Sequence, residues 1–135
     1  MSADQNLDVN ADVKGTLRLS KGAWLFAPDG VDVLLRVDPV PAPATDGFLS
    51  QSARVRLVVH GHVVTDVSGG DAIRPRTGVP SLLLGTVLGV LDGALVVDTG
   101  VAFMVRGAGA SIVGATVAVA VDDATDARGI RCELR

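Results

Sequence analysis

The stretch Gly15-Thr16-Leu17-Arg18-Leu19, continued by Gly22-Ala23-Trp24-Leu25-Phe26, is echoed later in the chain by Gly85-Thr86-Val87 and Gly93-Ala94-Leu95-Val96-Val97. The shift between the two copies is about 70 positions, with one residue of slippage before the second glycine. An echo of this kind predicts two small units with a common strand plan rather than one irregular fold.

Alternation of apolar and polar residues predicts that both units are built from β-strands. Leu17 and Leu19 fall on one side of a strand while Arg18 falls on the other. Asp92-Gly93 is a strong hairpin signal, and no segment of useful length has the period of a helix. Further strands are expected over Val31 to Val37, Ala53 to Leu57, Val101 to Arg106, Ala115 to Val119 and Ile130 to Leu134.

We therefore expect an all-β protein made of two small β-barrel units in tandem. The expected divisions are a flexible tail over residues 1–13, a first barrel-like unit over 14–73, a linker over 74–81 and a second unit over 82–135. One larger β-sandwich or barrel, built from a duplicated half, is the alternative.

The composition is that of a globular chain with enough apolar material for a core. Of the 135 residues 48% are hydrophobic, and the net charge is -3, which argues mildly against a dedicated nucleic-acid binder. A single cysteine, Cys132, excludes an intramolecular disulfide and fits a reducing compartment. The polar, acidic N-terminal residues do not resemble a signal peptide, and the apolar run 79–91 is too short to span a membrane. We expect a cytoplasmic protein.

The order of elements in the second copy resembles an OB-fold barrel, especially the compact S1-like type with five strands. The residues that carry this resemblance are Gly85-Thr86-Val87, Gly93 to Asp98, Gly100-Val101, Val113 to Val117 and Ile130 to Leu134. The first copy resembles the same pattern through Gly15-Thr16, Gly22-Ala23 and Val55 to Val59. The resemblance implies two divergent tandem barrels of a fold that binds oligonucleotides, oligosaccharides or proteins.

Arginine and aromatic residues of the first copy indicate single-stranded nucleic acid, DNA or RNA, as the first ligand to consider. Trp24 and Phe26 lie two residues apart and therefore share one side of a strand. Aromatic rings beside arginines bind single strands because bases stack on the rings while phosphates pair with the guanidinium groups. The alternative is an ordinary solvated face with both aromatic residues in the core. The candidate residues are Arg18, Trp24, Phe26, Arg36, Arg54, Arg56, Arg74 and Arg76.

The second copy has outward positions occupied by small apolar residues, namely Ala102, Met104, Ala118 and Ala120. Large bare apolar patches are rare on monomers, so we expect this face to be covered by the first copy or by another subunit. The alternative function is therefore that of a structural or assembly protein that forms homo-oligomers through this face.

Signs of catalysis and of metal binding are weak. His60 and His62 place two imidazoles on one face of a strand, but a metal site needs a third ligand, so we expect two surface histidines. Cys132 alternates with apolar neighbours and is expected to be a small buried residue rather than a nucleophile. No catalytic triad, phosphate loop or dinucleotide fingerprint is present. The sequence predicts a binding module that is not an enzyme and needs no cofactor.

Overall fold

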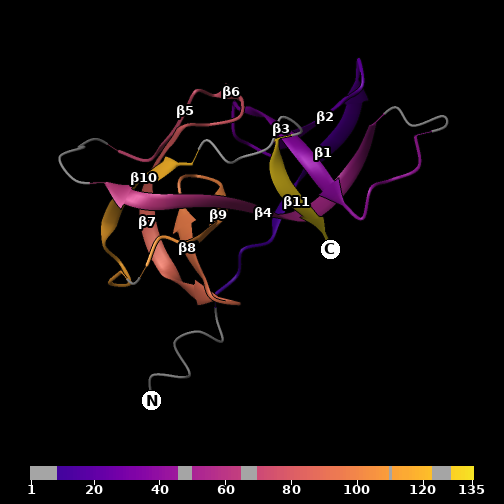
Figure 1. The fold of residues 1–135 in the computed structure, drawn as a ribbon. Coiled ribbons are helices and arrows are strands. Elements are labelled where there is room, and N and C mark those ends of the chain that lie inside the picture. The colour runs from indigo at the N-terminus through magenta and orange to yellow at the C-terminus, as the bar shows by residue number, and fades with distance from the viewer. Residues whose placement is uncertain (1–8, 46–49, 65–69, 110, 123–128) are drawn as a thin grey trace.

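A computed structural model describes residues 9–45, 50–64, 70–109, 111–122 and 129–135, and within these ranges the protein is all-β (Figure 1). One mixed sheet contains all eleven strands. Their bounds are β1 Val13–Ser20, β2 Ala23–Pro28, β3 Leu34–Val40, β4 Ser50–Val64, β5 Ala72–Arg74, β6 Thr77–Gly78, β7 Leu82–Leu91, β8 Ala94–Asp98, β9 Ala102–Arg106, β10 Thr116–Val121 and β11 Ile130–Leu134. In this part of the chain no helix has the length and apolarity needed to cross a membrane.

The long strand β4, with 15 residues, is paired along both edges. Val55 is the partner of Val13 in β1 and also of Leu134 in β11, so these two strands flank the first half of β4 from opposite sides. Farther along β4, β9 pairs with residues 57–60 and β10 pairs with residues 61–64. Figure 1 shows β1, β2, β3 and β11 gathered around one end of β4 and β7 to β10 around the other.

The pairings form two closed circuits that share β4. The first runs from β1 through β2, β3, β11 and β4 back to β1, and the second runs from β4 through β10, β7, β8 and β9 back to β4. Within these circuits the pairs β3–β11 and β4–β9 are parallel, and the others are antiparallel.

Each circuit takes one strand from the distant part of the chain. The C-terminal strand β11 completes the circuit of β1 to β4, while the second half of β4 completes the circuit of β7 to β10. The pairings therefore cross the expected division between residues 14–73 and 82–135 in both directions. The physical reason is that β4 continues through Val58 and Val59 without a turn, so its second half cannot fold back onto its first half.

Corresponding segments of the two copies are paired in the same register. Leu17 is the partner of Phe26 in the first circuit, and Val87 is the partner of Val97 in the second. The one-residue slippage between the copies coincides with a register shift between Val87 and Gly89, where Leu88 is an extra residue. A β-bulge accommodates such a residue by bending the strand locally.

The inward side chains of both circuits form one continuous hydrophobic core. Alternate residues of β4, Val55, Leu57 and Val59, belong to it and are at most 2% exposed. Because side chains alternate between the two faces of a strand, the even-numbered residues of β4 lie on its outer face. The outer face of β4 therefore passes from one circuit to the other, and it is where charged residues gather.

The N-terminal and linker expectations need correction. Residues 9–12 are packed rather than free, since Ala11 is fully buried, and β1 begins at Val13; the rest of the expected tail, residues 1–8, lies outside the described residues. The expected linker 74–81 contains β6, which pairs with β3, and the end of β5, which pairs with β7. Backbone pairing thus ties these segments to both circuits.

Candidate nucleic-acid interface

Arg18 and Arg36 lie on the outer face of the first circuit, in one row across three strands. Leu25 of β2 is the register partner of both Arg18 in β1 and Arg36 in β3. Two strand spacings separate the arginines, so their Cα atoms are about 10 Å apart. Both arginines are exposed, whereas Leu25 between them is half-buried. This set, Arg18, Leu25 and Arg36, is called the arginine row below.

The two aromatic candidates differ in their surroundings. Phe26 is 0% exposed and belongs to the core, so the expectation that it contacts a ligand is wrong. Trp24 is half-buried and packs against the rim of the core. It also lines a hollow of about 280 Å³ beside the turn between β1 and β2. The residues around this hollow are Gly22, Ala23, Trp24, Arg36, Val37 and Asp38.

Arg54 and Arg56 lie on β4, away from the arginine row. Arg54 is exposed and is the register partner of Lys14. Lys14 lies four residues before Arg18 on β1, so about 13 Å of strand separates the two. Arg56 is held by carboxylates instead: its Nε donates to Asp12 Oδ1 at 3.0 Å, and its Nη1 donates to Asp92 Oδ2 at 3.4 Å. With 16% of its side chain exposed, Arg56 has a structural role in joining the N-terminal segment to β4.

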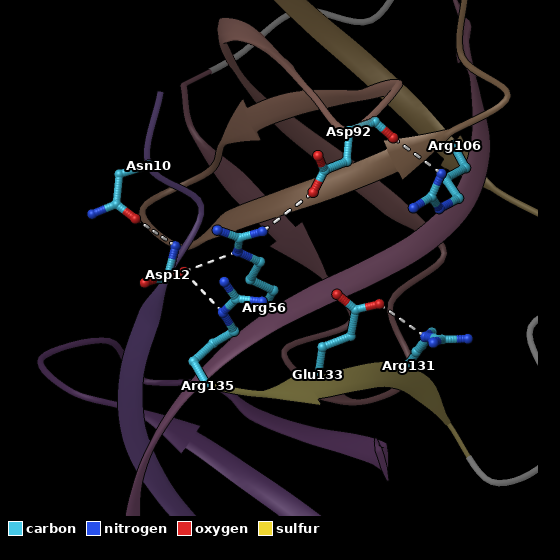
Figure 2. A network of polar contacts seen from close by, with 8 residues as sticks. All are labelled: Asn10, Asp12, Arg56, Asp92, Arg106, Arg131, Glu133 and Arg135. Atoms are coloured by element: carbon cyan, nitrogen blue, oxygen red, sulfur yellow. Dashed lines mark hydrogen bonds and ion pairs between the residues drawn. The ribbon is translucent and has the colours of Figure 1, made fainter. Parts of the chain in front are cut away.

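Figure 2 shows that the other arginines near β4 also have acidic or carbonyl partners. Arg135 Nε lies 3.9 Å from Asp12 Oδ1, and Arg131 Nε donates to Glu133 Oε2 at 3.0 Å. Arg106 Nη1 donates to the main-chain carbonyl of Asp92 at 3.3 Å. The ion pairs of Arg56, Arg131 and Arg135 offset part of the positive charge near β4.

Arg74 and Arg76 are exposed, but the structure does not bring them into the arginine row. Arg74 ends β5, which pairs with β7 of the second circuit. Arg76 Nε donates to the main-chain carbonyl of Asp32 at 2.9 Å. Of the eight candidates, only Arg18 and Arg36 therefore come together in one row on the outer face of the first circuit, while Trp24 lies on the inner side of β2 with Phe26.

The corresponding face of the second circuit is covered by the chain itself. Val96 and Met104, register partners of each other, correspond to Leu25 and Arg36 and are at most 1% exposed. They form a second apolar cluster with Ala11, against which Val9 also packs. The expected oligomer face needs correction for the same reason: Met104 and Ala118 are buried within one chain, and Ala102 and Ala120 are half-buried.

His60 and His62 are exposed on the outer face of β4, as the alternation predicts. His62 Nδ1 lies 3.1 Å from Asp122 Oδ1. Over the described ranges no three or more His, Cys, Asp or Glu side chains are grouped so that they could hold a metal ion.

Cys132 is fully buried on the inner face of β11, where the alternation predicts it. Burial, and secondarily the nearby charge of Asp38, raises the pKa of the Cys132 thiol from 9.0 to about 12. The thiol therefore stays protonated at neutral pH and is not a nucleophile.

The interpretation of the sequence missed Asp38 and the acidic partners of the arginines. Asp38 follows Arg36 by two residues in an alternating strand, so the strand period alone could have put both residues on one face. No local sequence pattern indicated that Asp12 and Asp92 would pair with Arg56. Both are far from Arg56 in sequence, and only the fold brings them into contact with it.

Basic residues are concentrated in the strands of the first circuit. These strands, with β4 counted to Val58, contain six basic and two acidic residues: Lys14, Arg18, Arg36, Arg54, Arg56 and Arg131 against Asp38 and Glu133. The strands of the second circuit, with the rest of β4, contain one of each, Arg106 and Asp98.

Neither a protein-family model, nor a curated protein, nor a solved structure matches this chain.

Proposed function

We propose that the chain is a binding module, not an enzyme, in which two OB-like barrels share β4 and the first barrel binds single-stranded nucleic acid. Both circuits have features that support this reading. In each, three consecutive antiparallel strands are followed by a fourth that returns to pair with the first, which is a Greek-key order. An OB barrel has five strands in such an order, and its second and third strands form the ligand-binding face.

The observation that carries the proposal is the contrast between two corresponding faces. In the second circuit the row Gly89, Val96 and Met104 is apolar and lies beneath the N-terminal segment. In the first circuit the corresponding arginine row is open and positively charged. One face is thus occupied in the folded chain, and the other is available to a ligand.

The charge of the arginine row favours a nucleic acid over an uncharged ligand. Two exposed guanidinium groups about 10 Å apart can each pair with a phosphate of an extended strand. The net charge of -3 does not oppose this because the acidic residues are located mainly outside the strands of the first circuit.

Titration of fluorescently labelled single-stranded DNA and RNA at several salt concentrations tests the proposal. We expect binding at low salt that weakens as salt rises, because phosphate contacts release counterions. The double variant Arg18→Ala, Arg36→Ala should reduce the slope of log affinity against log salt by about 1.4, from about 0.7 per lost phosphate contact on a single strand.

Arg74→Ala is the matched control, since it also removes an exposed arginine but lies on β5 beside the second circuit. It should leave the salt slope nearly unchanged. Absence of binding at low salt and micromolar protein would contradict the proposal, and so would an equal effect of Arg74→Ala and of the double variant.

Self-association is the second candidate function, and a different apolar surface favours it. Ile112 and Val113 are 81% and 57% exposed in the segment between β9 and β10. Gly114 and Ala115 bond to the backbone of Val87, which brings this segment beside the exposed Leu88 on β7. Light scattering that detects a dimer, lost in the double variant Ile112→Ser, Val113→Ser, would support this role, and a strict monomer at high concentration would exclude it.

A further inference from the structure

A larger hollow than the one beside Trp24 lies where β1 pairs with β4 in the first circuit. Its volume of about 630 Å³ is within the range of about 300–1,000 Å³ that is usual for small-molecule sites. Three basic residues line it: Lys14 from β1, Arg54 from β4 and Arg135, which follows β11. All three are exposed, so a ligand can reach them from solvent.

The three basic residues form one row across β1, β4 and β11. Lys14 and Arg54 are register partners in antiparallel strands, so their side chains lie on the same face. Arg135 continues the register of β11, since its main-chain N–H donates to the Arg54 carbonyl at 2.8 Å. The spacing of strands puts the Cα atom of Arg54 about 5 Å from that of each neighbour. This set, Lys14, Arg54 and Arg135, is called the Arg54 row below.

Two carboxylates also line the hollow, and both lie away from its centre. Asp12 already accepts from Arg56 at 3.0 Å and lies 3.9 Å from Arg135 Nε (Figure 2). Asp29 comes after Lys14 at the end of the row, where its main-chain N–H donates to the Lys14 carbonyl at 2.9 Å. Arg54, in the middle of the row, therefore has a basic residue on each side.

We infer that this hollow is a second phosphate site, with Arg54 at its centre. Like charges directly opposite each other in a sheet repel and destabilise the pair. Within the described part of the chain, no ion pair involves Lys14 or Arg54, so no acidic side chain offsets this repulsion through a direct contact. A phosphate bound between them would offset it and would accept charge-assisted hydrogen bonds from both side chains.

The position of the hollow makes it a continuation of the arginine row. The inference therefore rests on the proposed function and gives the bound strand a second set of phosphate contacts. Lys14 and Arg18 lie on the same face of β1, about 13 Å apart. Between them on this face lies Thr16, whose register partners are Ser52 in β4 and Ala27 in β2. No acidic residue of these strands separates the two rows, so a strand can pass from one to the other.

The second circuit shows that the fold does not require basic residues at these positions. There the pair that corresponds to Lys14 and Arg54 is Leu84 and Ala118, which are register partners of β7 and β10. Both are at most 4% exposed. An apolar pair thus serves the same strand pairing where the face is covered, and a basic pair occurs where the face is open.

The salt dependence of strand binding tests whether the strand reaches the hollow. Arg54→Ala and Lys14→Ala in the full-length protein should each reduce the slope of log affinity against log salt by about 0.7, which is the value for one phosphate contact on a single strand. Arg74→Ala is again the matched control, because it removes an exposed arginine outside both rows. Circular dichroism checks that each variant keeps the β-sheet spectrum.

Thermal unfolding with pyrophosphate tests the hollow without a nucleic acid. Millimolar pyrophosphate should raise the Tm of the full-length protein above its value in sodium chloride of equal ionic strength, because a ligand that binds the folded state stabilises it. The rise should be lost in Arg54→Ala and in Lys14→Ala and should persist in Arg74→Ala. An equal rise in all of these proteins would report a general salt effect and would contradict the site.

The outcomes separate this inference from the proposed function. A loss in either measurement that Arg74→Ala does not share supports the phosphate site. If Arg54→Ala and Lys14→Ala change neither measurement while the double variant of the arginine row lowers the salt slope, the phosphate site is wrong and strand binding stands. If no strand binds but pyrophosphate stabilises the protein through Lys14 and Arg54, the phosphate site stands and strand binding is wrong. If neither ligand binds, both are wrong.

Discussion

Gly15 and Gly85 occupy corresponding places in the two circuits, and neither place has room for a side chain. A Cβ atom added at Gly15 would overlap the carbonyl oxygen of Ala27, and one added at Gly85 would overlap that of Asp98. These carbonyls belong to the backbone of the neighbouring strand and cannot move away as the end of a flexible side chain could. The two glycines are thus required by strand packing and not only by a turn.

We predict that Gly15→Ala and Gly85→Ala each lower the free energy of unfolding by about 1–3 kcal/mol, because they overpack the strands. Gly70→Ala is the control, since nothing lies within 4 Å of its added Cβ atom. Urea unfolding followed by circular dichroism measures the difference. Equal stabilities of the Gly70 and Gly85 variants would show that the close approach is absent.

Cys132 supplies a second prediction at this scale, through the raised pKa of its thiol. The folded state keeps the proton up to about pH 12, whereas the unfolded thiol loses it near 9.0. The stabilising contribution of Cys132 is therefore complete below pH 9 and is lost as the pH rises to about 12.

At neutral pH the Cys132 thiol of the native protein should react slowly with iodoacetamide, and that of the protein unfolded in urea should react rapidly. Fast alkylation of the native protein would contradict its burial.

At the scale of elements, the N-terminal segment is held to β4 and β9 by apolar packing and by one carboxylate. Ala11 fills the cluster beside Met104, and Asp12 accepts from Arg56 at 3.0 Å. The side chain of Asp12 is 24% exposed, whereas that of Asp92, the other partner of Arg56, is 67% exposed. Partly buried charged hydrogen bonds contribute more to stability than exposed ones.

We therefore predict that Asp12→Ala lowers the free energy of unfolding by about 1–3 kcal/mol, and that Asp92→Ala lowers it by less than about 1 kcal/mol. Thermal unfolding of both variants checks the order. If Asp92→Ala proved the more damaging, the assignment of Asp12 as the principal partner of Arg56 would have to be abandoned.

The strands themselves were largely predictable, because alternation is a local property. Leu17, Val55 and Cys132 are buried, and Arg18 is exposed, as the period of two requires. The continuity of β4 was not predictable in the same way, since Gly61 can either end a strand or sit inside one. In the fold Gly61 is buried and lies too close to the Ala120 carbonyl to accept a side chain, so it marks close strand contact within β4.

The candidate site was predictable in part. Arg18 and Arg36 were correctly expected on outward positions, but only pairing through Leu25 makes them one row. The sequence could not exclude Phe26 and Arg56 as ligand contacts. The burial of Phe26 depends on which face of β2 meets the core. The ion pairs of Arg56 depend on Asp12 and Asp92, which are distant along the chain. Strand partners, unlike strands, are set by contacts between distant segments.

At the scale of the whole molecule, the two circuits exchange their closing strands. The first requires β11 from the C-terminus, and the second requires the end of β4. Neither half of the chain therefore contains a complete circuit. A strand that lies between two circuits also links their stabilities, because opening one circuit frees part of the strand that the other circuit needs.

We predict that fragments 1–73 and 74–135 do not fold separately and associate when mixed. Each fragment lacks a strand that the other supplies, and unpaired edges favour association. Circular dichroism and light scattering of each fragment and of the mixture measure this behaviour. Two separately folded monomers that ignore each other would be the contrary result.

Nuclear Overhauser contacts across β4 in the full-length protein test the exchange of strands most directly. We predict backbone contacts from Leu57 to both Cys132 in β11 and Phe103 in β9, together with contacts between Val63 and Val119. A tandem arrangement would instead pair β11 with β10 as a hairpin. Contacts between residues 130–134 and 116–121, with none from Leu57 to Cys132, would contradict the shared strand on which the account is built.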